Sequence, residues 1–115
     1  MPSPPLAPDD GAIDLEHLRR TTFGDASLER EVLIMFASQA TRLVGALGTL
    51  SPDAGRLSHT LKGSAGAIGA FRVAEAACEL ERTIQNGADP APDLAELRDA
   101  VAEARSAINA ILRCP

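Results

Sequence analysis

Apolar residues in this 115-residue chain recur every three or four positions along four long stretches, and this spacing constrains the fold most strongly. The stretches cover residues 26–47, 53–70, 72–85 and 93–112, and short turn signals separate them. A shorter stretch with the same spacing covers residues 14–21. Amphipathic helices joined by short loops bury their apolar faces against one another. The sequence therefore predicts an all-α fold, an antiparallel up-and-down four-helix bundle with a short extra N-terminal helix.

The composition agrees with packed helices rather than sheets. Much of the 45% hydrophobic content is alanine and leucine, and phenylalanine, present three times, is the only aromatic residue type. Strands are usually rich in β-branched and aromatic residues, whereas alanine and leucine favour helices.

Residues with known capping preferences stand near the expected helix ends. Asp14 and Asp25 are predicted to cap the first two helices, and either Ser51 or Asp53 the third. Asn86-Gly87 is predicted to end the fourth helix. We interpret the segment ADPAPD, residues 88–93, as a loop.

The apolar faces of the four long helices predict the core. The expected core positions are Leu28, Val32, Met35, Phe36, Leu43, Leu47, Leu57, Leu61, Ser64, Ala65, Ile68, Val73, Ala77, Leu80, Ile84, Leu94, Leu97, Val101, Ala104, Ile108 and Ile111.

Charge and the chain ends narrow the possible partners. The formal net charge of −5 argues against nucleic-acid binding, and no apolar run approaches the roughly 20 residues of a membrane span. Prolines and an Asp pair predict a disordered tail over residues 1–12, before a single domain over 13–113. No secretion signal is recognisable, so we expect a cytoplasmic protein with Cys78 and Cys114 as free thiols.

The segment SHTLKGSAGAIGA, residues 58–70, places a histidine away from the expected core. On a helical wheel with 100° per residue, His59 lies about 200° from Leu57, nearly opposite the apolar stripe. Lys62 lies one turn from His59. Three glycines share this side of the helix: Gly55, Gly63 and Gly66.

Glycines in the middle of a helix need a reason, because each costs about 0.5–1 kcal/mol relative to alanine. We interpret these glycines as leaving space, so that the backbone of another protein or a phosphoryl group can come close to the imidazole. A plainer interpretation is a solvated histidine beside glycines that serve helix packing. It explains neither the lysine nor the position of the glycines opposite the core.

The same residues resemble the signature of histidine-containing phosphotransfer (HPt) domains of bacterial two-component phosphorelays. The likeness extends over about residues 13–87 and includes Leu80 and Glu81 on the following helix. The matching signature residues are His59, Leu61, Lys62, Gly63, Ser64, Ala65, Ile68, Gly69 and Ala70.

The resemblance implies the same four-helix bundle and assigns roles to the site residues. His59 would accept a phosphoryl group from a receiver-domain aspartyl phosphate and pass it to a response regulator. Lys62 would lie beside the phosphoryl group, and Glu81 would accept a hydrogen bond from the ring. Receiver docking is expected on the adjoining surface of the second helix and on the glycine face, Gly55, Gly63 and Gly66.

A carboxylate partner suits this chemistry. An unperturbed imidazole titrates near about pH 6.5, so at neutral pH it is largely a neutral nucleophile. If Glu81 held the Nδ1 proton, Nε2 would be free to attack phosphorus. Alternatively, Glu81 is a solvated charge or pairs with Lys62 or Arg82.

Catalytic metal is expected on the partner rather than on this chain. Phosphoryl transfer usually uses Mg²⁺ held by carboxylates, and Asp53, the acidic residue closest to His59 in sequence, is six positions away. We therefore expect no cofactor, no metal site and no autonomous enzyme. The expected partners are receiver domains of response regulators and a hybrid sensor histidine kinase, with no nucleic acid, no membrane and a monomeric chain.

Two alternatives remain open from the sequence. In one, the chain is a substrate domain that a histidine kinase phosphorylates directly, which changes only the phosphoryl donor. The other belongs to a different class of function. The chain would then be an adaptor or inhibitor that docks on a receiver domain or a histidine kinase without being phosphorylated.

Overall fold

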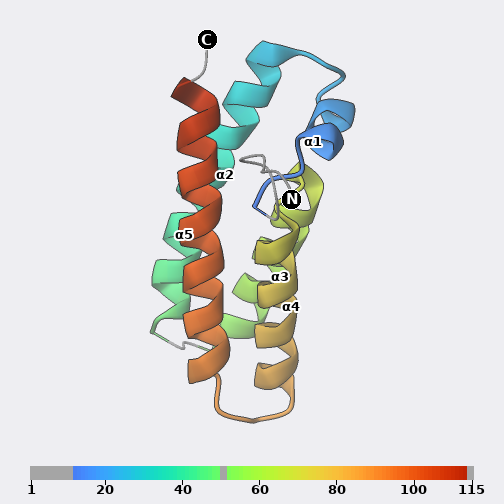
Figure 1. The fold of residues 1–115 in the computed structure, drawn as a ribbon. Helices are drawn as coiled ribbons and strands as arrows, with labels where there is room; N and C mark the ends of the chain where they lie inside the picture. Colours follow the sequence, from blue (N-terminus) through green and yellow to red (C-terminus); the bar gives the residue numbers. More distant parts are fainter. Residues whose placement is uncertain (1–11, 50–51, 114–115) are drawn as a thin grey trace, which may run out of the picture.

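The computed structural model describes residues 12–49 and 52–113, and within these ranges it contains five α-helices and no strand (Figure 1). This confirms the predicted all-α fold. The helices are α1 (Leu15–Thr21), α2 (Ala26–Leu47), α3 (Ala54–Ile68), α4 (Phe71–Gln85) and α5 (Ala91–Arg113).

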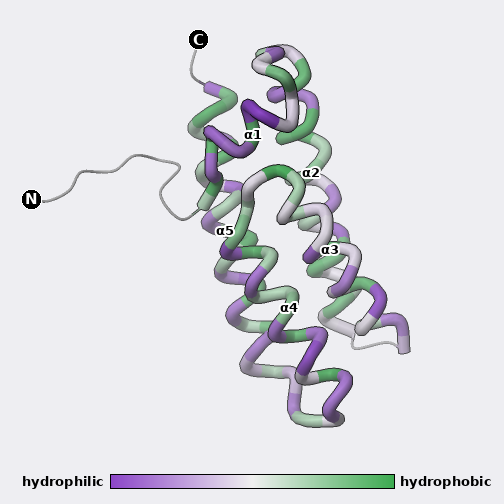
Figure 2. The backbone as a smooth tube through the Cα atoms, turned by 90° about the vertical axis from the view of Figure 1, so that its right-hand side faces the viewer, coloured by the Kyte–Doolittle hydropathy of each residue, from purple (hydrophilic) through white to green (hydrophobic). Residues whose placement is uncertain are grey.

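The four long helices run up and down in alternation, and α1 lies at one end of the bundle (Figure 1). Helix α3 packs against α2 and α4, and α5 packs against the same two helices from the other side, so α3 and α5 are diagonal. Hydrophobic and hydrophilic residues alternate along each helix with the helical period (Figure 2). One core between the helices follows from that pattern.

The predicted caps of the first two helices are confirmed. Carboxylate oxygens of Asp14 and Asp25 accept hydrogen bonds from the backbone N–H groups of His17 and Leu28, both at 3.1 Å. Asn86 ends α4, and Gly87 follows with φ of +70°. Asp53 precedes α3, but its side chain makes no capping hydrogen bond, and Ser51 lies outside the described residues.

Two helix boundaries differ from the prediction. Helix α3 ends at Ile68 rather than residue 70, because Gly69 adopts the left-handed conformation with φ of +88°. Helix α5 begins at Ala91, so the predicted loop over residues 88–93 is too long. Its first turn tolerates Pro92 because that turn has no partner for the missing N–H. The Asp89 carboxylate accepts a hydrogen bond from the Ala91 N–H at 3.0 Å.

Most predicted core positions are buried, but α2 and α3 are rotated from the expected orientation. The prediction for Met35 was wrong: this residue is 67% exposed, and Leu33 is buried instead. In α3, Leu57 and Ser64 are only partly buried, whereas Ser58 is completely buried. The Ser58 hydroxyl donates to the Gly55 carbonyl at 3.0 Å, so its burial leaves no unpaired polar group. Six of the predicted core positions are only partly buried: Leu28, Val32, Leu57, Ser64, Ile84 and Ile111.

The segment before α1 is fastened to the end of α3. The Asp14 N–H donates to the Gly69 carbonyl at 2.9 Å, and a Cβ atom on Gly69 would lie 2.8 Å from the Asp14 carbonyl oxygen. His17 of α1 adds a contact of 3.2 Å between Nε2 and the Ala67 carbonyl, and its ring meets the Phe71 ring edge-on. Both the backbone conformation and the close approach therefore require glycine at position 69.

Most residues of the two chain ends lie outside the part of the chain that the structure describes. Residues 1–11 of the predicted tail and Cys114 are not described, while Ala12 packs partly against the core. Cys78 is a free thiol that is partly buried in α4. None of the helices in residues 12–49 and 52–113 combines the length and apolarity needed to cross a membrane.

We predict that Gly69→Ala destabilises the fold by at least about 2 kcal/mol, since a left-handed non-glycine residue costs roughly 1–2 kcal/mol before any clash. Gly66→Ala is the matched control, because a Cβ there meets no atom within 4 Å. The control should be neutral or stabilising by about 0.5–1 kcal/mol. Urea unfolding of both variants measures the difference, and equal stabilities would contradict this account of Gly69.

Candidate phosphotransfer site

His59 stands on the open face of α3. Its side chain is 65% exposed, and α3 buries Ser58, Leu61 and Ala65 on its other side. A Cβ atom added at Gly63 or at the neighbouring glycine, residue 66, would meet no atom within 4 Å. The surface at these two glycines, beside the imidazole, is therefore clear of other side chains.

Gly55 differs from the other two glycines of the predicted docking face. A Cβ on Gly55 would lie 3.9 Å from Cγ2 of Ile84, which is an ordinary van der Waals contact with α4. Gly55 thus faces the α3–α4 boundary, and its assignment to receiver docking stays a prediction.

Glu81 of α4 joins the two other predicted site residues. Its Oε2 lies 2.9 Å from Nδ1 of His59, and its Oε1 accepts a hydrogen bond from Nζ of Lys62, also at 2.9 Å. An ionised carboxylate can only accept, so Nδ1 of His59 carries the proton. In the neutral ring this leaves Nε2 unprotonated.

The helical pair α3–α4 explains why residues 22 positions apart meet. The two helices are antiparallel neighbours joined at Gly69-Ala70, so residues at similar distances from this turn face each other. His59 and Lys62 lie one turn apart on α3 and approach the same carboxylate. The neighbouring Leu80 is completely buried, which holds Glu81 at the edge of the core with a side chain only 15% exposed.

The carboxylate and the ammonium stabilise each other's charged forms. The pKa of Glu81 is below its ordinary value, chiefly because Lys62 donates a hydrogen bond; the hydrogen bond from His59 adds to this, and desolvation opposes it. The pKa of Lys62 is above its ordinary value, chiefly because of the same bond with Glu81, again against desolvation. Both groups are therefore charged at neutral pH.

The lowered pKa of Glu81 determines how its contribution to the stability of the fold changes with pH. A carboxyl group whose pKa is lowered by folding stabilises the fold above its unfolded pKa. That contribution is lost as the pH falls through the lower pKa of the folded state. At neutral pH Glu81 is therefore ionised, and its stabilising contribution is fully present.

We predict that Lys62→Met raises the pKa of Glu81, because the strongest stabilisation of the carboxylate is removed. The carbon-13 shift of the Glu81 carboxyl group, followed by NMR through an acid titration, reports the pKa directly. Arg82→Met, a neighbouring cation whose side chain pairs with Glu79, is the control and should change this pKa less. An unchanged pKa in Lys62→Met would contradict the geometry described above.

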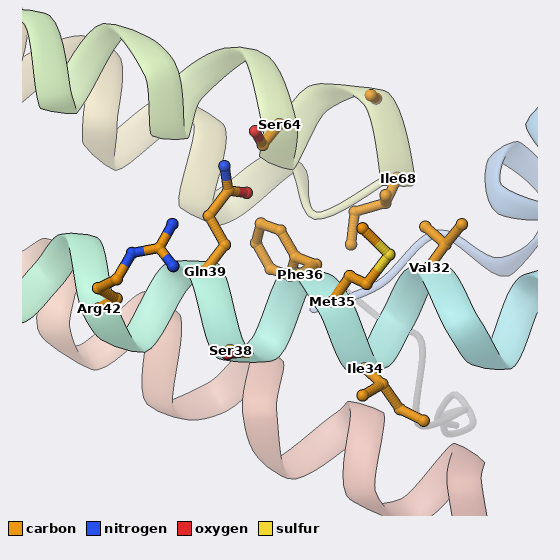
Figure 3. Close-up of a pocket in the computed structure, with 10 residues that line it drawn as sticks. Val32, Ile34, Met35, Phe36, Ser38, Gln39, Arg42, Ser64 and Ile68 are labelled. Atoms are coloured by element: carbon orange, nitrogen blue, oxygen red, sulfur yellow. The ribbon is translucent and has the colours of Figure 1, made fainter.

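An apolar groove between α2 and α3 adjoins this face (Figure 3). Met35 points across it toward Ile68 and gives its α2 side an exposed apolar surface, while the exposed Ile34 extends from α2 away from α3. Docking on the adjoining surface of the second helix was expected from the sequence, but Met35 was placed in the core rather than on this surface. Leu33 and Phe36 are three positions apart and both are buried. A buried helix face drawn through these two residues leaves Met35 on the exposed side.

Comparison with known families decides the class of this protein. The Hpt domain family matches residues 31–107, which is more than half of the chain and includes His59, Lys62 and Glu81. The chain belongs to the Hpt domain family. Histidine phosphotransfer is accordingly its function at the level of the family.

A solved structure supports the Hpt domain fold. A rice protein assigned as a histidine-containing phosphotransfer protein superimposes with a TM-score of 0.80 and 22% sequence identity, covering 91% of this chain and 82% of the rice chain. At this identity the likeness concerns the fold. A search among curated protein sequences found no match.

Within the described ranges, no three His, Cys, Asp or Glu side chains gather in a way that could hold a metal ion. The location of Mg²⁺ on the partner stays a prediction.

Proposed function

We propose that this Hpt protein is a phosphoryl carrier in which His59 accepts a phosphoryl group from the aspartyl phosphate of one receiver domain and delivers it to another. The observation that carries the proposal is the 2.9 Å contact between Glu81 Oε2 and Nδ1 of an exposed imidazole. It directs the lone pair of Nε2 outward, where a second protein can reach it.

The transfer step balances without an additional reactant. The Nε2 lone pair attacks phosphorus, the N–P bond forms, and the bond between phosphorus and the aspartate oxygen breaks. The aspartate leaves as a carboxylate. His59 keeps its Nδ1 proton, so the phosphorylated ring carries a positive charge that the Glu81 carboxylate stabilises. Transfer to the second receiver is the reverse reaction with a new aspartate.

Lys62 and the bare surface complete the proposed site. The Lys62 ammonium lies one turn from His59 and can offset negative charge on the phosphoryl oxygens, while its bond to Glu81 keeps it near the ring. The open space at Gly63 and Gly66 admits the receiver backbone. The adjoining groove, with Met35 exposed, offers apolar area for docking.

The receiver would supply the rest of the catalytic machinery. Mg²⁺ and its carboxylate ligands belong to the receiver in this proposal, so the Hpt protein is a substrate and carrier rather than an enzyme. A hybrid sensor histidine kinase is the proposed source of the phosphoryl group, and the cytoplasm the proposed compartment.

The test is transfer of a labelled phosphoryl group from purified, phosphorylated receiver domains. We predict that the wild-type chain acquires an acid-labile label and that His59→Gln acquires none, because the nucleophile is absent. His17→Gln is the matched control, since it removes the other histidine, and it should retain the label.

Two results would contradict the carrier proposal. Label on His59→Gln would place the phosphoryl group elsewhere. Receiver binding with no label on the wild-type chain would indicate the adaptor function instead.

A further inference from the structure

The segment of the sequence that contains His59 has a net charge opposite in sign to that of the whole chain. The protein has 16 acidic and 11 basic residues, yet between residues 32 and 70 it has one carboxylate, Asp53, and three cations, Arg42, Arg56 and Lys62. This segment contains most of α2 and all of α3. Helices α4 and α5 contain seven of the other carboxylates, Glu75, Glu79, Glu81, Asp93, Glu96, Asp99 and Glu103, and Asp89 lies between the two helices.

Arg56 lies on the α2 side of His59. It precedes His59 by one turn on α3, and residues at this spacing have neighbouring side chains. Residues 11 apart in an α-helix lie almost on one line, so Arg56 is aligned with Ala67, which lines the groove facing α2. The Arg56 side chain is 68% exposed and contacts the Asp53 carboxylate at 3.4 Å.

Arg42 lies on α2 and lines the same groove as Ala67. Its guanidinium extends toward α3 (Figure 3). Gln39 and Ser64 face each other in the groove, so one further turn along the antiparallel helices brings Arg42 level with residues 60–61. Lys62 and Glu81 occupy the opposite, α4 side of His59.

We infer that Arg42 and Arg56 form a basic docking patch that binds carboxylates bordering the phosphoryl site of the incoming receiver. The inference rests on the proposed function and assigns its partner an acidic surface beside the aspartyl phosphate. Carboxylates that hold Mg²⁺ give such a site negative charge, and a basic patch accelerates the encounter with it. The apolar groove then contributes contact area, and the patch sets orientation and association rate.

The Arg56–Asp53 pair leaves Arg56 available for this role. Exposed ion pairs contribute little to stability, so exchanging Asp53 for a receiver carboxylate requires little free energy. The Asp53 side chain makes no capping bond that would be lost when the pair separates. The guanidinium can then bind a carboxylate through two parallel hydrogen bonds.

The test compares two double variants with equal net charge. Arg42→Gln with Arg56→Gln removes the basic docking patch, and Arg20→Gln with Arg105→Gln removes two exposed arginines of α1 and α5. Transfer kinetics from a phosphorylated receiver domain are measured at 50 and 300 mM NaCl. Binding of the same receiver, with Mg²⁺ and beryllofluoride in its phosphoryl site, is measured by calorimetry at both salt concentrations.

We expect the patch variant to lower kcat/KM about tenfold at 50 mM NaCl, with a difference of less than about twofold at 300 mM and an unchanged kcat. The control variant should match the wild-type chain. Asp53→Asn, which removes the opposing carboxylate, should raise kcat/KM at the lower salt concentration.

Three results would overturn the inference: equal losses in both double variants, a loss that persists at 300 mM NaCl, or a fall in kcat. The proposed function fails separately. In that case the wild-type chain takes no label, while calorimetry still decides whether binding depends on Arg42 and Arg56.

Discussion

The hydrogen bonds of one carboxylate organise the functional face of this protein. Glu81 accepts the Nδ1 proton of His59 with one oxygen and an ammonium proton of Lys62 with the other. The first bond selects the tautomer of the imidazole and directs Nε2 toward solvent. The second maintains the negative charge of the carboxylate, so that it can stabilise the positive ring of a phosphohistidine.

The packing of the helix bundle holds the Glu81 carboxylate in position. The turn at Gly69 and Ala70 sets the register of α3 against α4, and the burial of Leu80 keeps Glu81 at the edge of the core. The glycines of α3 and the glycine that follows its last residue consequently have different roles. Gly63 and Gly66 leave space beside the imidazole, whereas Gly69 allows the chain before α1 to approach within hydrogen-bonding distance.

The fold was predictable because its signals are local. The apolar periodicity gives the helices, and the carboxylates of Asp14 and Asp25 give two of their starts. The start of α5 was not predictable from the same rules, because a proline can either end a loop or occupy the first helical turn. The exposure of Met35 depends on which neighbours α2 meets, and periodicity alone leaves that rotation uncertain by a residue.

The candidate site was only partly predictable for a similar reason. The spacing of His59 and Lys62 on one helix is a property of the sequence, and their contact with Glu81 depends on the register between two helices. Sequence analysis left open whether Glu81 would pair with the imidazole, with Lys62 or with neither, and the structure shows contacts with both. The basic docking patch beside His59 could not be predicted from the sequence, because it depends on how α2 lies against α3.

The most direct test of this account is the tautomer of His59 in the unphosphorylated protein. Nitrogen-15 NMR of the imidazole distinguishes a protonated from an unprotonated ring nitrogen. We predict that, in the neutral ring, Nδ1 carries the proton and Nε2 is unprotonated, and that Glu81→Ala abolishes this preference. A neutral ring protonated at Nε2 in the wild-type protein would contradict the account, because the nucleophilic lone pair would then face Glu81 instead of the partner.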